Sequence, residues 1–193
     1  VPEESIDLMY TYIDTPPPED NGDALGILSP TQDTYGTVVV RLIHAGFSRG
    51  EIFDLLEHIY KNVPSGRYFN YTVESVVAET VSPFYNTLDR IRETLTLLEN
   101  RLDAENEFSI VALGKALSET LRAAHEMSYL SSPNTITWDI RPLPATPAVL
   151  ETREHAISIL KRMLCHQSVQ VRRKAVEICG EIGSMSRDDG ECP

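Results

Sequence analysis

Apolar residues recur at helical spacing along most of the chain, and they predict paired helices. The longest run alternates at steps of four and three residues, as in a helix packed lengthwise on another: Phe84, Leu88, Ile91, Leu95, Leu98 and Leu102. A polar break at 103–107 precedes a second stripe: Ile110, Leu113, Leu117, Leu121 and Ala124. Because the heptads stop after roughly three and reverse, we expect an antiparallel hairpin within one chain rather than a coiled-coil dimer.

Two earlier helices are predicted to form another hairpin over 34–62. Apolar positions mark the first at Val38, Val39, Leu42 and Ile43 and the second at Ile52, Leu55, Leu56 and Ile59. The valine run at 38–40 would also suit a strand. We prefer a helix because Gly46 can end one helix, and Ser48 with Glu51 can open the next as a capping box. Asn62, Val63 and Pro64 end it.

Shorter helices and proline-rich stretches complete the pattern. We expect a helix over 3–13, with Ile6, Met9, Tyr10 and Ile13 on one face, and another whose stripe is Val73, Val76, Val77 and Val81. Ser82 and Pro83 interrupt that stripe, and the proline is expected to start the following helix. For residues 14–34 the pattern predicts an irregular exposed spacer rather than a ligand for a polyproline-binding domain.

A second proline-rich stretch over 131–147 holds the single tryptophan, Trp138. Residues 135–140 alternate as a short strand would, but no second strand is obvious, and a lone strand cannot form a stable sheet. We therefore expect an extended segment packed across helices, with Trp138 and Ile140 sealing a junction. The alternative is an exposed docking strand anchored by Trp138, since tryptophan is enriched among residues that dominate interfaces.

The most informative pattern lies between His155 and Gly183. A first helix places Ala156, Ile157, Leu160, Met163 and Leu164 on one side, and a second carries Val171, Arg172, Ala175 and the run Gly180-Glu181-Ile182-Gly183. This stretch resembles a HEAT-type helical repeat over about residues 149–183, one repeat's length. In the turn, His166 and Gln167 replace the family's usual Asp and Pro, which leaves Ser168 as the candidate N-cap. The alternative interpretation is an ordinary helical hairpin in a bundle.

The resemblance implies stacked neighbours and a binding role rather than chemistry, because one repeat cannot bury its apolar faces alone. We therefore predict an all-α chain whose hairpins stack as an irregular bundle or short α-solenoid with a HEAT-like C-terminal unit. The expected parts are an N-terminal helix and loop (1–34), a helical-hairpin domain (35–130), a connector (131–147), the HEAT-like hairpin (148–184) and a flexible tail (185–193).

Composition and charge narrow the functional classes. With 193 residues, 41% of them apolar and 24% charged, the chain can bury a core, and its net charge of -12 opposes non-specific attraction to nucleic acid or anionic lipid. A protein partner is therefore favoured. No apolar stretch is long enough to cross a bilayer and no signal sequence is visible, so we expect a soluble intracellular protein, cytoplasmic by default. The start at Val1 and the end at Pro193 suggest a chain trimmed from a longer one.

The sequence offers little catalytic or metal-binding chemistry. There is no phosphate loop, and His125-Glu126 lacks the second histidine of a zinc protease. His44 and His58 could meet across the first hairpin but have no third partner. The three cysteines form no C-x-x-C pair, and we expect Cys165 and Cys179 to fill space as small hydrophobes. We predict no enzyme, no cofactor and no metal site.

The best competing function comes from a basic cluster in this acidic chain: Lys161, Arg162, Arg172, Arg173 and Lys174. Together with Trp138 these residues are the candidate partner-binding positions. The cluster could hold nucleic acid phosphates or an acidic peptide. We prefer a solvated helix face, partly neutralised by Glu177 and Glu181, with Arg172 making the inter-repeat contacts that the resemblance implies. A third alternative is a regulatory helical domain beside an enzymatic neighbour.

Overall fold

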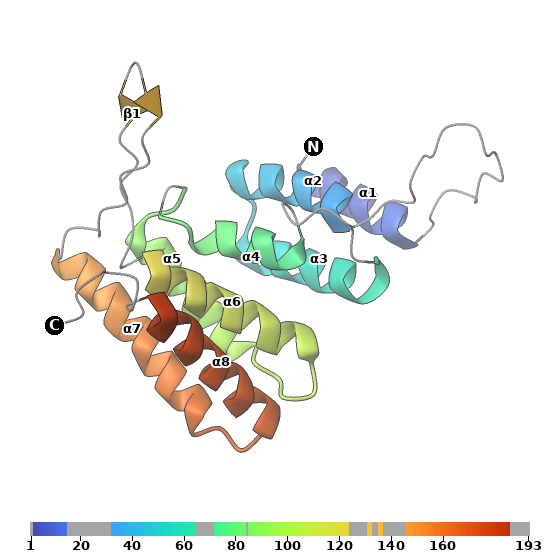
Figure 1. The fold of residues 1–193 in the computed structure, drawn as a ribbon. Helices are drawn as coiled ribbons and strands as arrows, with labels where there is room; N and C mark the ends of the chain where they lie inside the picture. The colour runs from blue at the N-terminus through green and yellow to red at the C-terminus, as the bar shows by residue number, and fades with distance from the viewer. Residues whose placement is uncertain are drawn as a thin grey trace, which may run out of the picture. The chain divides into compact units, whose positions relative to one another are not determined.

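The computed structural model describes residues 2–14, 32–64, 72–83, 85–123, 131–132, 135–136 and 146–185. Within these ranges the protein is all-α apart from one pair of two-residue strands, as Figure 1 shows. The helices are α1 (Pro2–Asp14), α2 (Gln32–His44), α3 (Arg49–Asn62), α4 (Val73–Val81), α5 (Leu88–Asn100), α6 (Glu107–Ala123), α7 (Pro147–Leu164) and α8 (Val169–Met185). The chain divides into two compact units, Val1–Glu79 and Thr80–Pro193.

In the first unit, α3 packs against both α1 and α2. The predicted stripe of α3 is fully buried at Ile52, Leu55, Leu56 and Ile59. Ser48 and Glu51 form the expected capping box, and Gly46 has a φ of 88°, a conformation that glycine adopts without strain. The valine run is helical, with Val39 buried and Val38 exposed, so the helical interpretation is confirmed.

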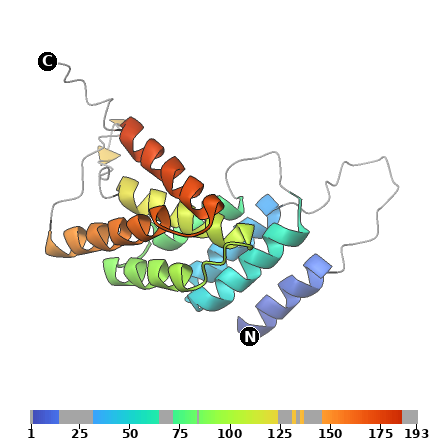
Figure 2. The ribbon, with the colours of Figure 1, turned by 90° about the horizontal axis from the view of Figure 1, so that it is seen from below.

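The second unit contains two helical hairpins, α5/α6 and α7/α8. Each hairpin packs internally, α5 lies beside α7, α6 lies beside α8, and α6 also contacts α7. Figure 2 shows this second unit from below, with α8 alongside α6 and α7 alongside α5. The fully buried side chains between the helices include Leu95, Leu113, Leu117 and Ile159. All-α architecture built from packed hairpins is therefore confirmed.

The start of α5 differs from the prediction. We expected Pro83 to open this helix, but Pro83 lies in a turn, and α5 begins at Leu88. The reason is local. The Thr87 hydroxyl accepts a hydrogen bond from the Arg90 amide and caps the helix there, so the heptad pattern begins before the helix does. Leu102 likewise lies beyond the helix, and Phe84 and Ala124 lie outside the described residues.

The hairpin α7/α8 corrects the burial predictions for four residues. Ala156, Leu160 and Met163 are buried as expected, but Ile157 is only half-buried and Leu164 is exposed; these two turn away from the side that carries the buried Ile159. Cys165 and Cys179 are both exposed, so they do not fill core space. Cys165 instead ends α7, where its amide donates to carbonyls of the last turn, and Cys179 falls on an outer side of α8.

A short strand pair lies in the stretch where we expected an extended segment with no obvious partner strand. Strand β2 (Thr135–Ile136) pairs antiparallel with β1 (Ser131–Ser132), and Ser131 stands opposite Ile136. The partner strand is only two serines long, too short for an alternating pattern to reveal it. Trp138 and Ile140 lie outside the described residues, as does the spacer predicted over 14–34 except at its ends, where Asp14 belongs to α1 and residues 32–34 belong to α2.

Candidate interaction surface

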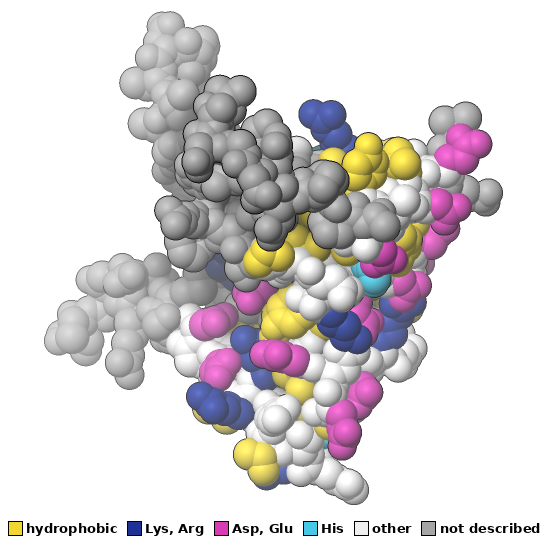
Figure 3. Space-filling model, turned by 90° about the vertical axis from the view of Figure 1, so that its right-hand side faces the viewer, with side chains coloured by type: hydrophobic (Ala, Val, Ile, Leu, Met, Phe, Trp, Pro, Cys, Tyr) yellow, Lys and Arg dark blue, Asp and Glu magenta, His cyan; other side chains and the backbone are white. Residues whose placement is uncertain are grey.

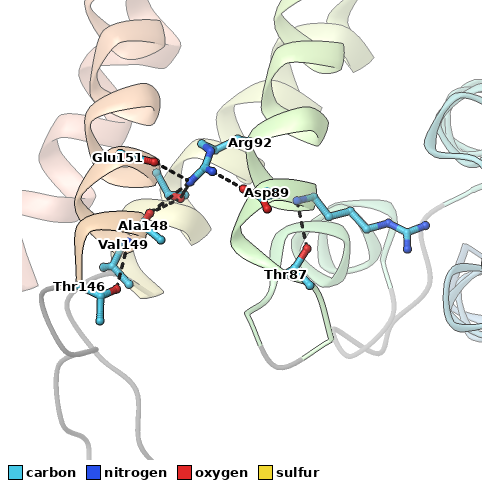
Figure 4. Close-up of polar contacts among 9 residues, drawn as sticks. Thr87, Asp89, Arg92, Thr146, Ala148, Val149 and Glu151 are labelled. Atoms are coloured by element: carbon cyan, nitrogen blue, oxygen red, sulfur yellow. Dashed lines mark hydrogen bonds and ion pairs between the residues drawn. The ribbon is translucent and has the colours of Figure 1, made fainter.

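Polar contacts link the first helices of the two hairpins, α5 and α7. Arg92 on α5 donates through Nη1 to the Thr152 hydroxyl at 2.9 Å and to the Ala148 carbonyl at 3.3 Å, and it also pairs with Asp89 on its own helix. Figure 4 shows the Arg92 side chain reaching from α5 to the first turns of α7, where Glu151 also approaches it. Because Thr152 is buried, this contact lies at the edge of the core.

The same seam continues toward the far ends of both helices. The Thr96 hydroxyl and the His155 ring share a hydrogen bond of 3.0 Å, and Arg162 forms two hydrogen bonds with the Glu99 carboxylate. The bond to Glu99 raises the pKa of the Arg162 guanidinium, although partial burial acts in the opposite direction. Residues that come later in α5 contact residues that come later in α7, so the two helices run parallel.

The second helices, α6 and α8, are also parallel. The aliphatic stem of Lys174 lies against Gly114, where a Cβ atom would come within 2.7 Å of the lysine Cε. One turn later on α6, and two turns later on α8, the Ser118 hydroxyl donates to the Glu181 carboxylate at 2.6 Å. The hairpins are therefore stacked in register, first helix on first helix and second helix on second helix.

Most of the predicted basic cluster is engaged within the chain. Arg162 binds Glu99, while Arg173 and Lys174 both pair with Glu177, at 3.4 Å and 3.3 Å. The expected neutralisation by Glu177 is therefore present, and the Glu181 carboxylate accepts a hydrogen bond from the Ser118 hydroxyl. The positive charge of this region is partly balanced, which weakens it as a phosphate-binding surface.

Arg172 has a structural role in the turn between α7 and α8. Its Nη1 donates to the carbonyls of His166 and Gln167, both at 2.7 Å, and so fixes these two residues of the turn. The Ser168 carbonyl accepts the Arg172 amide, and the Ser168 amide donates to the His166 ring. Lys161 is exposed, and Trp138 lies outside the described residues.

Candidate chemistry elsewhere does not assemble in the described residues. His58 contacts Asp14 at 2.6 Å and stacks edge-on against Tyr10, rather than meeting His44. No three His, Cys, Asp or Glu side chains in these ranges come together as metal ligands would. Among the described helices, none combines the length and apolar run that a bilayer crossing requires.

The seam residues were missed by sequence reasoning. Arg92, Glu99 and His155 sit on polar helix faces, where the pattern suggested only solvent. Their partners come from a helix more than fifty residues away, so no local spacing could have paired them. The available signal was weak: three polar residues at helical steps on α5 face a similar series on α7.

Comparisons of the chain with protein families, curated proteins and solved structures give no match.

Proposed function

We propose that this protein is a non-catalytic protein–protein interaction or scaffold module built on a HEAT-like pair of stacked hairpins. The observation that carries the proposal is the parallel stacking of α5 on α7 and of α6 on α8. In an up-and-down four-helix bundle, the first and last helices would pack together. Here α5 and α8 do not pack extensively, and this supports a short solenoid rather than a closed bundle.

Solenoids act by presenting one rigid face to a partner, commonly the face made by successive second helices. In this protein that second-helix face combines side chains from α6 and α8: Lys115, Ser118, Arg122, Glu177 and Glu181. It carries both signs of charge, which suits a polar protein surface better than a polyanion. Acidic side chains also recur across the face drawn in Figure 3, with Lys and Arg between them.

The nucleic-acid alternative is less well supported. Arg162, Arg173 and Lys174 are paired with carboxylates, and Arg172 is held by the α7–α8 turn. A phosphate ligand would have to break these contacts and approach a chain of net charge -12. No contact within the described residues favours a regulatory role beside an enzyme over simple partner binding.

The test is affinity capture on the whole chain with charge-reversal variants on opposite faces. Lys115→Glu changes the second-helix face, whereas Glu93→Lys changes the exposed outer side of α5 and is the matched control. We expect a protein that is recovered by the unaltered chain and by Glu93→Lys, in high salt and after nuclease, but lost with Lys115→Glu. Recovery that vanishes with nuclease, or that the two variants affect equally, would contradict the proposal.

A further inference from the structure

The hairpin α7/α8 leaves one broad face that neither α5 nor α6 covers. Thr152 and Arg162 of α7 point to α5, and the helical repeat places Leu150, Ile157 and Leu164 on the opposite side of α7. These three residues follow one another at steps of one heptad. They therefore form a straight stripe along the free side of the helix, which we name the α7 stripe.

This free face is unusually apolar. Of the eight large hydrophobic residues that are exposed within the described ranges, four lie on α7 and α8: Leu150 at 44%, Leu164 at 37%, Val169 at 67% and Val176 at 60%. Val169 and Val176 are also one heptad apart, and they turn away from the side of α8 where Lys174 and Glu181 meet α6. An exposed apolar patch shared by two neighbouring helices indicates an interaction surface.

The charges beside the α7 stripe have a particular order. From its N-terminal to its C-terminal end, the free side of α7 carries Leu150, Glu154, Ile157, Lys161 and Leu164. An antiparallel copy of this series places leucine opposite leucine and glutamate opposite lysine. Within the described residues, neither Glu154 nor Lys161 makes an ion pair, and both are exposed. The stripe is therefore complementary to an antiparallel copy of itself.

From this order we infer that a second copy of the chain binds the free face of α7 and α8, related by a two-fold axis that passes beside Ile157. In this arrangement Leu150 meets Leu164 of the second copy, and Glu154 meets its Lys161. The short turn places Val169 beside Leu164, so Val176 lies level with Ile157 and meets its own counterpart at the axis. This self-association goes beyond the proposed function, because it uses the free face of α7 and α8 rather than the second-helix face.

The size of this face sets the strength of the association. A helix of 18 residues is about 27 Å long, and two neighbours about 10 Å apart cover on the order of 500 Å² in projection. A standard interface buries about 800 Å² per partner, so the dimer belongs to the small, reversible class. We expect a dissociation constant in the micromolar range, visible as a mass that rises with concentration.

Sedimentation equilibrium on the full chain tests the dimer through charge exchange. We expect the apparent mass to rise from 21.6 kDa toward twice that value with increasing concentration. Glu154→Lys and Lys161→Glu should each weaken association about tenfold, because either change puts like charges opposite each other twice per dimer. The double variant should restore it. The two residues are two turns apart on one helix and do not touch, so rescue requires contact between copies.

A second pair of variants tests the axis. Val176 is exposed, so Val176→Glu and Val176→Lys should fold normally by circular dichroism but not self-associate, whereas an equimolar mixture of the two should associate. A monomer at every concentration, or a double variant that fails to restore the dimer, would overturn the inference. Affinity capture by the Val176→Glu variant, which should not self-associate, separates the two proposals, since retained dependence on Lys115 would leave the proposed function standing without the dimer.

Discussion

The Arg162 guanidinium on α7 donates two hydrogen bonds to the Glu99 carboxylate on α5, Nε to Oε1 at 2.5 Å and Nη2 to Oε2 at 2.9 Å. The two residues are 63 positions apart in sequence, so this contact joins one hairpin to the next. The Arg162 side chain is 56% exposed and that of Glu99 is 24% exposed. Solvent therefore screens the pair, and its geometry matters more than its bare charge.

A double-mutant cycle measures this link. Arg162→Ala and Glu99→Ala should each lower the free energy of unfolding by about 0.5–1.5 kcal/mol, with a coupling of about 0.5–1 kcal/mol between them. Arg162→Lys keeps the charge but loses the planar fork, so we expect it to lose most of the coupling. Urea denaturation at low salt and at about 1 M salt would show the coupling shrink by screening. Additive single effects at low salt would mean that the contact does not stabilise the stack.

Arg172 and Arg173 are adjacent in sequence but should differ sharply in importance. Arg172 holds two turn carbonyls, whereas the Arg173 side chain is 81% exposed and forms one loose ion pair with Glu177. Arg172→Ala should lower the free energy of unfolding by about 1–2 kcal/mol, because it removes two charge-assisted hydrogen bonds. Arg173→Ala should change it by no more than about 0.5 kcal/mol.

Thermal or urea unfolding of both variants checks this contrast. Of these two adjacent arginines, only Arg173 can be changed to Glu to test the nucleic-acid alternative without disturbing the turn. Equal losses of stability for the two arginines would show that the turn contacts of Arg172 contribute little.

The core of each helix could be predicted because burial depends on local period. Ile91, Leu95 and Leu98 are buried where the alternating steps place them, and Ser48 caps α3 because a capping box needs only three residues of spacing. The start of α5 could not be predicted in the same way. A threonine cap at Thr87 competes with a proline start at Pro83, and local energies of similar size do not decide between them.

The surfaces were less predictable than the cores. The positive cluster was visible in sequence, and its neutralisation by Glu177 followed from helical spacing. The partner of Arg162 could not be predicted from spacing, because Glu99 reaches Arg162 only when the two hairpins stack. Leu164 was assigned to the buried side although it faces outward, since an apolar residue on a free face follows the same period as one in a core.

Two glycines in helices should respond oppositely to alanine. At Gly180, which is exposed, an added Cβ meets nothing within 4 Å, so Gly180→Ala should raise the free energy of unfolding by about 0.5–1 kcal/mol through helix propensity. At Gly114 the same Cβ would approach Lys174 Cε at 2.7 Å and Cγ at 2.9 Å. The lysine stem must move, and we expect Gly114→Ala to be neutral or destabilising by up to about 1 kcal/mol.

The Lys174 contact can be isolated by combining substitutions. In a Lys174→Ala background the obstacle is gone, so Gly114→Ala should there become stabilising, as at Gly180. Urea denaturation of the two single variants and the double variant gives the comparison. If Gly114→Ala stabilises the unaltered chain as much as Gly180→Ala does, then α6 and α8 do not approach each other closely at this point.

Tyr10 should make the first unit sensitive to alkaline pH. Burial raises the pKa of its phenol above the usual 10.0, and the nearby carboxylates of Asp54, Asp14 and Glu57 raise it further. The unfolded chain therefore releases this proton at lower pH than the folded chain does. The resulting contribution to stability is complete below about pH 10 and is lost as the pH rises through the higher folded value.

Removing the phenol should remove this part of the alkaline loss. Melting temperatures between about pH 9 and about pH 11 should fall less steeply for Tyr10→Phe than for the unaltered chain, because phenylalanine has no proton to release. The Tyr10 ring packs edge-on against His58 with centroids 5.0 Å apart, a contact that phenylalanine can keep. Tyr85→Phe, at an exposed position, is the control for a general effect of tyrosine removal. Parallel melting curves for Tyr10→Phe and the unaltered chain would show that the carboxylates around Tyr10 do not couple its ionisation to folding.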